Sequence, residues 1–237
     1  NLRNSIFVDV TANESISQTY SNYLRQNIAV VTCNKIACSS AYDNYSNLKQ
    51  LSRKFNSPFL FETNVGAGLP IIDTLKHLIA SGDKVHKIQA VLSGSLNFIF
   101  NNFDDKNSFH DVVKEAQRLG YTEPDPRIDL SGVDVKRKIL ILVREGGYQM
   151  EMDDVLVKDI LPKSCFEVES VDDFFGELVK YEETFAAQLK QAQSEIRKLR
   201  VVAVFDGAQA SVELQAVDAQ HPFYSLQGTD NVVAIYT

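Results

Sequence analysis

Three short apolar segments alternate with helical sequence at the start of the chain, and this alternation constrains the fold more than any other feature. Residues 5–10, 28–32 and 58–62 each have the composition of a buried strand, and helical sequence lies between them to about Arg25 and over 45–55. Strands that alternate with helices need crossover connections, which produce a parallel sheet. Because the chain starts on a core strand, we also expect it to be a piece of a longer protein.

An acidic segment with two prolines, residues 120–130, follows a predicted helix in the middle of the chain. It carries Glu123, Asp125 and Asp129. Its prolines fix φ and disfavour helical geometry in the residues that precede them. We therefore expect an extended, stiff loop that holds its carboxylates apart. Clustered ionisable groups of this kind are typical of functional sites.

A helix is predicted directly after this loop, from Ser131 to a glycine pair at 146–147. Within it, Asp134 and Lys138 are four residues apart and share one face. Two interpretations are open. Ser131 and Asp134 fit a capping box and Asp134–Lys138 an ordinary surface pair, which the spacing alone favours. Alternatively, the pair and the neighbouring Glu123 form an active site on a partly buried helix face.

A glycine-containing loop, residues 62–70, precedes a helix expected over 71–81. Its glycines allow tight turns, so several carbonyls can point to one site, where Glu62 adds a carboxylate. Hard cations prefer such oxygen ligands. The glycine spacing matches neither a dinucleotide fingerprint nor a P-loop, so we do not expect the loop to hold phosphate.

Further candidate positions follow the ends of strands, where parallel sheets bind ligands. Thr11 follows the first strand and Lys35 follows the strand over 28–32. Lys35 is interpreted either as a cation that faces a ligand or as a solvent-exposed loop lysine. Residues 93–97 open a short helix after the strand over 85–92, and the free N–H groups there can receive a carboxylate or a phosphate.

Composition argues against several classes of protein. The formal net charge of −7 and the lack of a basic cluster argue against a nucleic-acid partner. No segment has the length and apolar character of a membrane span. Three cysteines without metal-ligand spacing and four scattered histidines argue against a zinc site and suit a reducing cytoplasm. The acidic loop also lacks the pattern of a calcium-binding loop.

The last third of the chain predicts an α+β arrangement. A capping box at Ser170 opens a long helix to about Ile196, and the apolar stripe of this helix predicts core packing. Strands are expected over 198–205, 210–217 and 231–236, with an Asp-Gly turn joining the first two into a hairpin.

Taken together, these segments resemble the homoserine dehydrogenase family. The resemblance rests on GYTEPDPRIDLSG with the later Asp134 and Lys138, and on VVTCNKIACSS, FETNVGAGLPI, VLSGSLNFIF and HPFYSLQGTDNVV in the same order. It covers nearly the whole chain. It is strongest with the members in which the dehydrogenase is fused to an aspartokinase, so the resemblance implies an aspartokinase as covalently linked partner.

The family's architecture implies an α/β fold in two parts. Residues 1–64 would be the end of a Rossmann-type nucleotide-binding domain. Residues 65–237 would be an α+β catalytic and dimerisation domain with a mixed sheet, in which residues 226–237 return toward the nucleotide-binding domain. The implied activity is NAD(P)H-dependent interconversion of L-aspartate 4-semialdehyde and L-homoserine, in threonine and methionine biosynthesis, by a cytoplasmic homodimer or larger homo-oligomer.

The resemblance also implies a role for each matching position. The catalytic positions would be Lys138, as proton donor to the carbonyl, and Lys35. The substrate-binding positions would be Glu123, Asp134, Asp129, Tyr121 and Ser95. The positions that approach NADP or NAD would be Thr11, Lys35, Gly94 and Gly120. A monovalent cation such as Na⁺ would be held by Glu62 and by the backbone carbonyls of Val65, Ala67 and Leu69.

Three points stay open at this level. Asp134 favours the charged form of Lys138, so either Lys138 or Lys35 is the possible proton donor. The GxGxxG element expected before Asn1 and the glycine-rich segment expected after Thr237 are not in the sequence, so we expect weak cofactor binding and little activity from these residues alone. The alternative function is a non-catalytic dimerisation and regulatory module of the fused enzyme.

Overall fold

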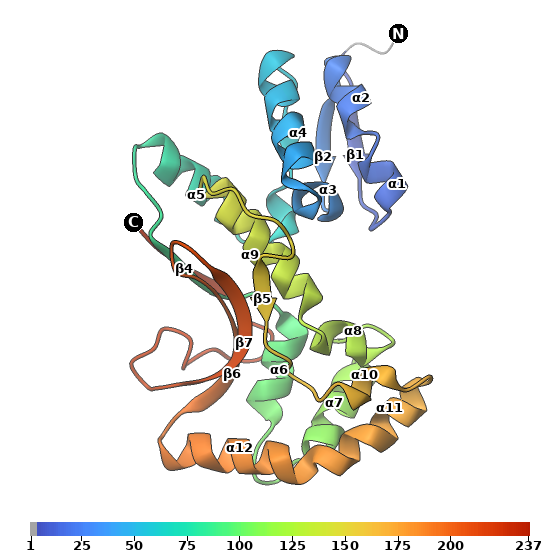
Figure 1. Cartoon of the computed structure of the whole chain (residues 1–237), viewed down its shortest axis with the longest axis vertical. Helices are drawn as coiled ribbons and strands as arrows, with labels where there is room; N and C mark the ends of the chain where they lie inside the picture. Colours follow the sequence, from blue (N-terminus) through green and yellow to red (C-terminus); the bar gives the residue numbers. More distant parts are fainter. Residues whose placement is uncertain (1–3) are drawn as a thin grey trace.

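A three-stranded parallel sheet forms one end of the molecule (Figure 1, top). In the computed structural model, which describes residues 4–237, its strands lie in the order β1 (Ile6–Asp9), β2 (Ala29–Thr32) and β3 (Phe59–Leu60). Both neighbouring pairs are parallel, so the predicted parallel sheet is confirmed. β3 is shorter than predicted because residues Glu62–Asn64 form a 3₁₀ turn, η1.

Short helices connect these strands. They are α1 (Glu14–Ser17), α2 (Tyr20–Arg25), α3 (Ile36–Ser39) and α4 (Tyr42–Lys54). The single helix predicted after the first strand is wrong, because the chain forms α1 and α2 instead. The Asn13 side chain caps α1 by accepting the N–H of Ile16, and Gln18 already lies outside that helix.

A five-stranded mixed sheet lies in the middle of the molecule, in the order β5-β7-β6-β4-β8 (Figure 1). Its strands are β4 (Lys87–Val91), β5 (Val155–Val157), β6 (Lys198–Phe205), β7 (Ala210–Val217) and β8 (Val232–Tyr236). β5 runs parallel to β7 and the other pairs are antiparallel. The predicted hairpin of β6 and β7 is confirmed, and Asp206 accepts two backbone N–H groups in its turn.

The remaining helices cover this sheet and lie between the two sheets. They are α5 (Ile71–Ala80), α6 (Gly94–Asn102), α7 (Phe109–Arg118), α8 (Pro126–Leu130), α9 (Val133–Glu145), α10 (Ser164–Glu167), α11 (Val171–Leu178) and α12 (Glu182–Ser194). The capping box at Ser170 is confirmed, but the continuous helix predicted after it is wrong. A 3₁₀ turn, η2 (Val179–Tyr181), separates α11 from α12. At the start of α12, the Glu182 carboxylate accepts two N–H groups of the first turn of α7.

The acidic segment after α7 differs from the prediction of an extended loop. Its second half is the helix α8, with Asp125 as N-cap and Pro126 in the first turn. Proline is favoured at that position because its missing N–H has no partner in a helix anyway, and its φ already suits the helix. The prolines therefore start a helix here, whereas the sequence pattern suggested that they prevent one.

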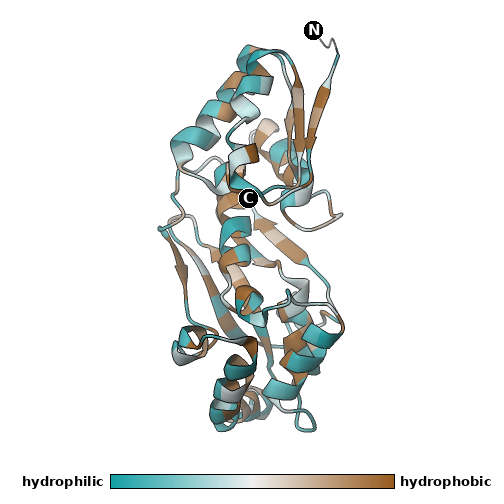
Figure 2. Ribbon diagram, turned by 90° about the vertical axis from the view of Figure 1, so that its right-hand side faces the viewer, coloured by the Kyte–Doolittle hydropathy of each residue, from teal (hydrophilic) through white to brown (hydrophobic). Residues whose placement is uncertain are grey.

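Helix α9 lies between the two sheets and joins them into one core (Figure 1). It contacts α3 and α5 as well as β5, β6 and β7. The residues of its second half, 139–143, are 0% exposed. Each such aliphatic side chain stabilises the fold by roughly 1.5–3 kcal/mol. Figure 2 shows the apolar residues concentrated on the strands and on the inner faces of the helices.

No helix within residues 4–237 combines the length and the apolar character that crossing a membrane requires.

Candidate active site

A cavity of about 530 Å³ lies at the N-terminal end of α9, between the two regions of the molecule. Every residue predicted for catalysis or substrate binding lines it, and so does every predicted cofactor position except Thr11. These lining residues are Lys35, Gly94, Ser95, Gly120, Tyr121, Glu123, Asp129, Asp134 and Lys138. Their roles stay predictions, but the structure brings together positions up to about a hundred residues apart in the sequence.

Two lysines from different parts of the chain share one carboxylate in this cavity. Lys138 Nζ lies 2.8 Å from one oxygen of Asp134, and Lys35 Nζ lies 3.3 Å from the other. Lys138 also donates to the backbone oxygen of Leu92, at 2.6 Å. Its ammonium group is thereby fixed from two directions, and its side chain is only 17% exposed.

The two ammonium groups decide the charge of Asp134. Partial burial by itself opposes ionisation of this carboxyl, but Lys138 and Lys35 outweigh burial and hold its pKa below the ordinary value of 3.8. Lys138, Lys35 and Asp134 together carry two positive charges and one negative charge, so the three side chains have a net charge of about +1. Such a group can stabilise negative charge that develops on an oxygen atom nearby.

Helix α9 begins differently from the prediction, because the proposed capping box of Ser131 and Asp134 is wrong. The N-cap is Gly132, at φ 70°, and Ser131 ends α8 instead. A left-handed residue between two helices lets the chain turn sharply. This turn frees Asp134 from capping, and its carboxylate contacts the two lysines instead. The predicted ion pair of Asp134 and Lys138 is confirmed.

In the acidic segment, Asp125 and Asp129 form contacts within the fold, whereas the Glu123 carboxylate faces the cavity. Asp125 pairs with Arg127, and Asp129 accepts hydrogen bonds from Ser95 Oγ, at 2.7 Å, and from the N–H of Glu123, at 2.9 Å. Asp129 thereby ties the segment to the first turn of α6. The Glu123 carboxylate lines the cavity and makes no hydrogen bond or ion pair with any residue in the part of the chain that the structure describes.

Five residues that line the cavity were not predicted as site residues: Ser93, Ile128, Val135, Thr229 and Asn231. Two of them, Thr229 and Asn231, precede β8 in a segment that packs against α6. Asn97 of α6 holds their segment by donating to the carbonyl of Asp230, at 3.1 Å. A β-carbon on Gly94 would lie 3.2 Å from the side chain and the carbonyl of Thr229, so only glycine leaves this approach unhindered. The run Gly-Thr-Asp-Asn before a predicted strand was the available signal.

Thr11 lies outside this cavity, at the carboxyl end of β1. Its N–H and hydroxyl both donate to Asp9, whose buried carboxylate also accepts from Tyr20 and Asn34. The Thr32 hydroxyl donates to the Tyr20 oxygen, because the single proton of Tyr20 goes to Asp9. This hydrogen-bonded group closes the ends of β1 and β2, and leaves Thr11 itself exposed at the edge where parallel sheets bind ligands.

The loop predicted to hold a cation has a structural role as well. The two oxygens of Glu62 accept the N–H groups of Ile72 and Asp73, so this carboxylate caps α5. Leu69 O accepts the N–H of Ile71. Val65 is buried, and Ala67 has a φ of 52°. The cation site on these residues stays a prediction.

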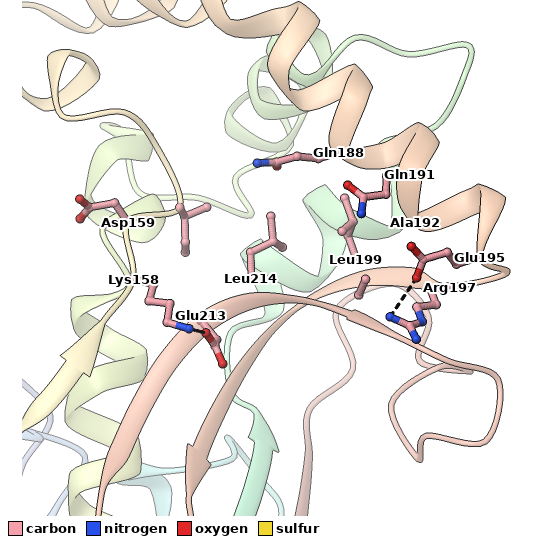
Figure 3. A pocket seen from close by; sticks show the side chains of 12 residues that line it. Lys158, Asp159, Gln188, Gln191, Ala192, Glu195, Arg197, Leu199, Glu213 and Leu214 are labelled. Atoms are coloured by element: carbon pink, nitrogen blue, oxygen red, sulfur yellow. Dashed lines mark ion pairs between the residues drawn. The ribbon is translucent and has the colours of Figure 1, made fainter.

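A second groove, of about 410 Å³, lies between α12 and the strands β6 and β7 (Figure 3). Gln188 and Gln191 of α12 line it on the helix side (Figure 3). Its cations are each paired with a carboxylate: Lys158 with Glu213, and Arg197 with Glu195 at 3.0 Å. Because these charges neutralise one another, the groove is less suited to acid–base chemistry than the cavity at α9.

The chain is similar to known proteins that are named as dehydrogenases. A bifunctional aspartokinase/homoserine dehydrogenase of the Zea mays chloroplast is 42% identical over 99% of this chain, and the match spans 26% of the relative. A homoserine dehydrogenase of Schizosaccharomyces pombe is 40% identical over 98% of this chain and 64% of the relative. The chain thus spans between about a quarter and two thirds of the curated relatives it matches.

Solved structures agree in fold. A Candida auris protein of unknown function matches with a TM-score of 0.93 and 38% identity, over 99% of this chain and 68% of that one. A hyperthermophilic archaeal homoserine dehydrogenase, solved in complex with NADPH, matches with a TM-score of 0.72 and 26% identity, over 97% of this chain and 61% of that one.

Family models divide the chain at the same place as the two sheets. The NAD-binding domain of homoserine dehydrogenase matches residues 1–62, and the homoserine dehydrogenase model matches residues 70–237. The two matches leave only residues 63–69 uncovered, from within η1 to just before α5. The chain therefore belongs to the homoserine dehydrogenase family.

Proposed function

We propose that this chain carries the catalytic cavity of an NAD(P)H-dependent homoserine dehydrogenase, which interconverts L-aspartate 4-semialdehyde and L-homoserine. The observation that carries the proposal is the contact of Lys35 and Lys138 with one carboxylate, Asp134, beside the unpaired carboxylate of Glu123. A substrate with an aldehyde and an ammonium group needs both features: a cationic proton donor and a free anion.

The residues divide the work as follows. Glu123 binds the substrate's ammonium group, because its carboxylate faces the cavity and makes no hydrogen bond or ion pair within residues 4–237. Asp134 holds the two lysines in place. We therefore assign the substrate's ammonium group mainly to Glu123 and give Asp134 the positioning of the lysines as its main role. Lys138, fixed by Asp134 and the Leu92 carbonyl, donates the proton to the carbonyl oxygen as negative charge develops there. Lys35 adds a second positive charge. Asp129, Ser95 and Tyr121 line the same cavity and give it shape.

A nicotinamide nucleotide, when bound, supplies the hydride. The chain's own residues fit such a group at two points. Gly120, at φ 75°, has no atom within 4 Å of the position of a β-carbon, so its cavity face is open to a flat ring. Lys35 and the exposed Thr11 both follow strands of the parallel sheet at its ligand-binding edge. The preference for NADP or NAD and the Na⁺ site on Glu62 remain parts of the proposal.

The experiment compares Lys138→Met and Lys35→Met in the full-length protein, by NADPH-dependent reduction of aspartate semialdehyde. Loss of a general acid lowers kcat by about 10²–10⁴-fold. We expect Lys138→Met to show this loss with little change in KM, and Lys35→Met to show a smaller loss.

Lys158→Met is the matched control, because Lys158 lies in the groove of Figure 3 and not in the cavity. It should retain the parental kcat and KM. Near-normal turnover by Lys138→Met would contradict its role as proton donor and move that role to Lys35 or to water.

The second candidate function is a non-catalytic dimerisation and regulatory module of an enzyme fused to an aspartokinase. It predicts self-association without binding of NADPH, so a titration with NADPH separates it from the first. A homodimer, a linked aspartokinase and a reducing compartment are further parts of the proposal. The three free cysteines, Cys33, Cys38 and Cys165, support the last of these.

A further inference from the structure

The C-terminal end of α9 carries two adjacent buried charges that the proposed mechanism does not use. The side chains of Arg144 and Glu145 are 0% and 1% exposed. Both bind residues of the α3–α4 segment, which begins at Lys35. We infer that Arg144 and Glu145 are positioning residues, which hold α9 against α3 and α4 so that Lys35 reaches Asp134. This inference depends on the proposed function of the cavity.

Arg144 binds the α3–α4 connection through its backbone. One nitrogen of its guanidinium donates to the carbonyls of Cys38 and Ser40, at 2.9 and 2.7 Å. The other nitrogens donate to Met150 O. Burial lowers the pKa of Arg144, but guanidinium remains charged at any physiological pH. A planar fork with several fixed donors sets both the distance and the orientation of the segment that it binds.

Glu145 binds the next helix through side chains. Its carboxylate accepts a short hydrogen bond from the Tyr45 hydroxyl, and Lys49 Nζ lies 2.8 and 2.9 Å from its two oxygens. We call Arg144, Glu145, Tyr45 and Lys49 the α9 latch. Buried ion pairs contribute little net stability compared with apolar residues of similar size, and their best-attested effect is to specify one geometry.

The latch and the lysine pair are the two ends of one contact between helices. Ten residues separate Asp134 from Arg144, which is about 15 Å along a helix. Between them, Arg137 reaches Ser39 Oγ at 3.3 Å. If the axis of α9 tilted by about 10° around the latch end, Asp134 would move by roughly 2.5 Å, given its distance of about 15 Å along the helix. The 3.3 Å contact of Lys35 with Asp134 would then be lost.

The experiment is a double-mutant cycle between the latch and the lysine pair in the full-length protein. Glu145→Gln keeps the shape of the side chain and removes its charge. We expect it to lower kcat about tenfold, because displacement of a reacting group by 1 Å can cost up to a hundredfold. In a Lys35→Met background the same substitution should have almost no further effect, because the contact that it positions is already absent.

A second measurement does not depend on catalysis. Cys38 is fully buried beside the latch, and burial raises the pKa of its thiol. A thiol reagent should therefore modify the exposed Cys33 quickly and Cys38 slowly. Glu145→Gln should accelerate the slow reaction severalfold, and Cys38→Ala should remove the accelerated phase and identify its source.

The control is Phe185→Leu in α12, a buried substitution far from α9. It lowers the global stability without touching the latch, so it should leave kcat unchanged and accelerate Cys38 modification less than Glu145→Gln does. Where Glu145→Gln does not fold, Lys49→Met carries the same test, because Lys49 is 24% exposed.

The outcomes separate the latch from the function. If the parent enzyme has no dehydrogenase activity, the proposed function is wrong. Faster Cys38 modification in Glu145→Gln would still support the latch as the contact that holds α9 against α3 and α4. Unchanged Cys38 reactivity overturns the inference. So does a kcat effect of Glu145→Gln that is equally large with and without Lys35, because the latch then does not act through that lysine.

Discussion

At the scale of single residues, Asp134 organises the cavity. Its carboxylate forms ion pairs with Lys138 of its own helix and with Lys35 at the start of α3, about a hundred residues earlier. Spacing predicted the first contact, because residues four apart on a helix share a face. The contact with Lys35 is what makes this pair more than a surface ion pair.

The lowered pKa of Asp134 makes its contribution to stability depend on pH. A carboxyl with a depressed folded-state pKa stabilises the fold above its unfolded value, here 3.8, and this contribution is lost as pH falls through the lower folded value. Asp134→Asn should therefore lower Tm most at neutral pH, and the difference from the parent should shrink below pH 3.8. Thermal unfolding at several pH values measures this.

Asp83→Asn is the control for that titration. The Asp83 carboxylate is exposed and makes no hydrogen bond or ion pair with any residue within 4–237. It should leave Tm nearly unchanged at every pH. A constant difference between Asp134→Asn and the parent down to pH 2.5 would contradict the charge pairing.

At the scale of secondary-structure elements, the first residues of three helices line part of the cavity. α3 presents Lys35, α6 presents Gly94 and Ser95, and α9 presents Asp134. Helix starts carry free N–H groups and a positive dipole end, which suits anionic parts of ligands. The short helix α8 turns the acidic segment back toward α6 through Asp129.

The close approach of α6 to the segment before β8 predicts a selective effect of Gly94→Ala. The added β-carbon would lie 3.2 Å from Thr229 and displace the wall that Thr229 forms. We expect kcat/KM to fall about tenfold, because small shifts of positioning groups are costly. Tm should change little, because Thr229 is exposed.

Gly176→Ala in α11 is the matched control. A β-carbon there meets no atom within 4 Å, and alanine is favoured over glycine inside a helix by about 0.5–1 kcal/mol. It should raise Tm slightly and leave kinetics unchanged. Parental kinetics in Gly94→Ala would show that Thr229 does not shape the site.

At the scale of the whole molecule, one core holds both sheets. The main apolar cluster runs from the parallel sheet through α9 to the mixed sheet. A smaller cluster of Val91, Val202, Val217 and Phe223 lies apart from it. Because α9 belongs to the main cluster, we expect the two sheets to lose stability together.

Leu142→Ala tests this common core. Leu142 is 0% exposed, and truncation of a buried leucine costs about 2–5 kcal/mol. Amide hydrogen exchange followed by mass spectrometry should show faster exchange in β2 and in β6 to a similar extent. Leu119→Ala, at a residue that is 46% exposed, should change neither. Faster exchange in only one sheet would mean that the sheets are independent.

The sequence by itself determined many of the local elements and supplied the candidate residues of the cavity. Period, turn residues and caps are local signals, so the parallel sheet, the hairpin of β6 and β7 and the capping box at Ser170 were predictable. The nature of the cavity residues was also predictable, because the motifs that resemble the family contain Glu123, Asp134 and Lys138.

Only the tertiary structure decided what those residues contact. The start of α8 at Pro126 follows a local signal, the N-cap Asp125 before a proline, which the prediction of an extended loop did not use. The break between α11 and α12 instead lies where Tyr181 and Glu182 bind residues distant in sequence, and such contacts override local propensity. The same holds for the Lys35 contact with Asp134 and for the α9 latch, since both join segments about a hundred residues apart. Local patterns carry no information on such pairs, because only the packing of α9 against α3 and α4 brings them within reach.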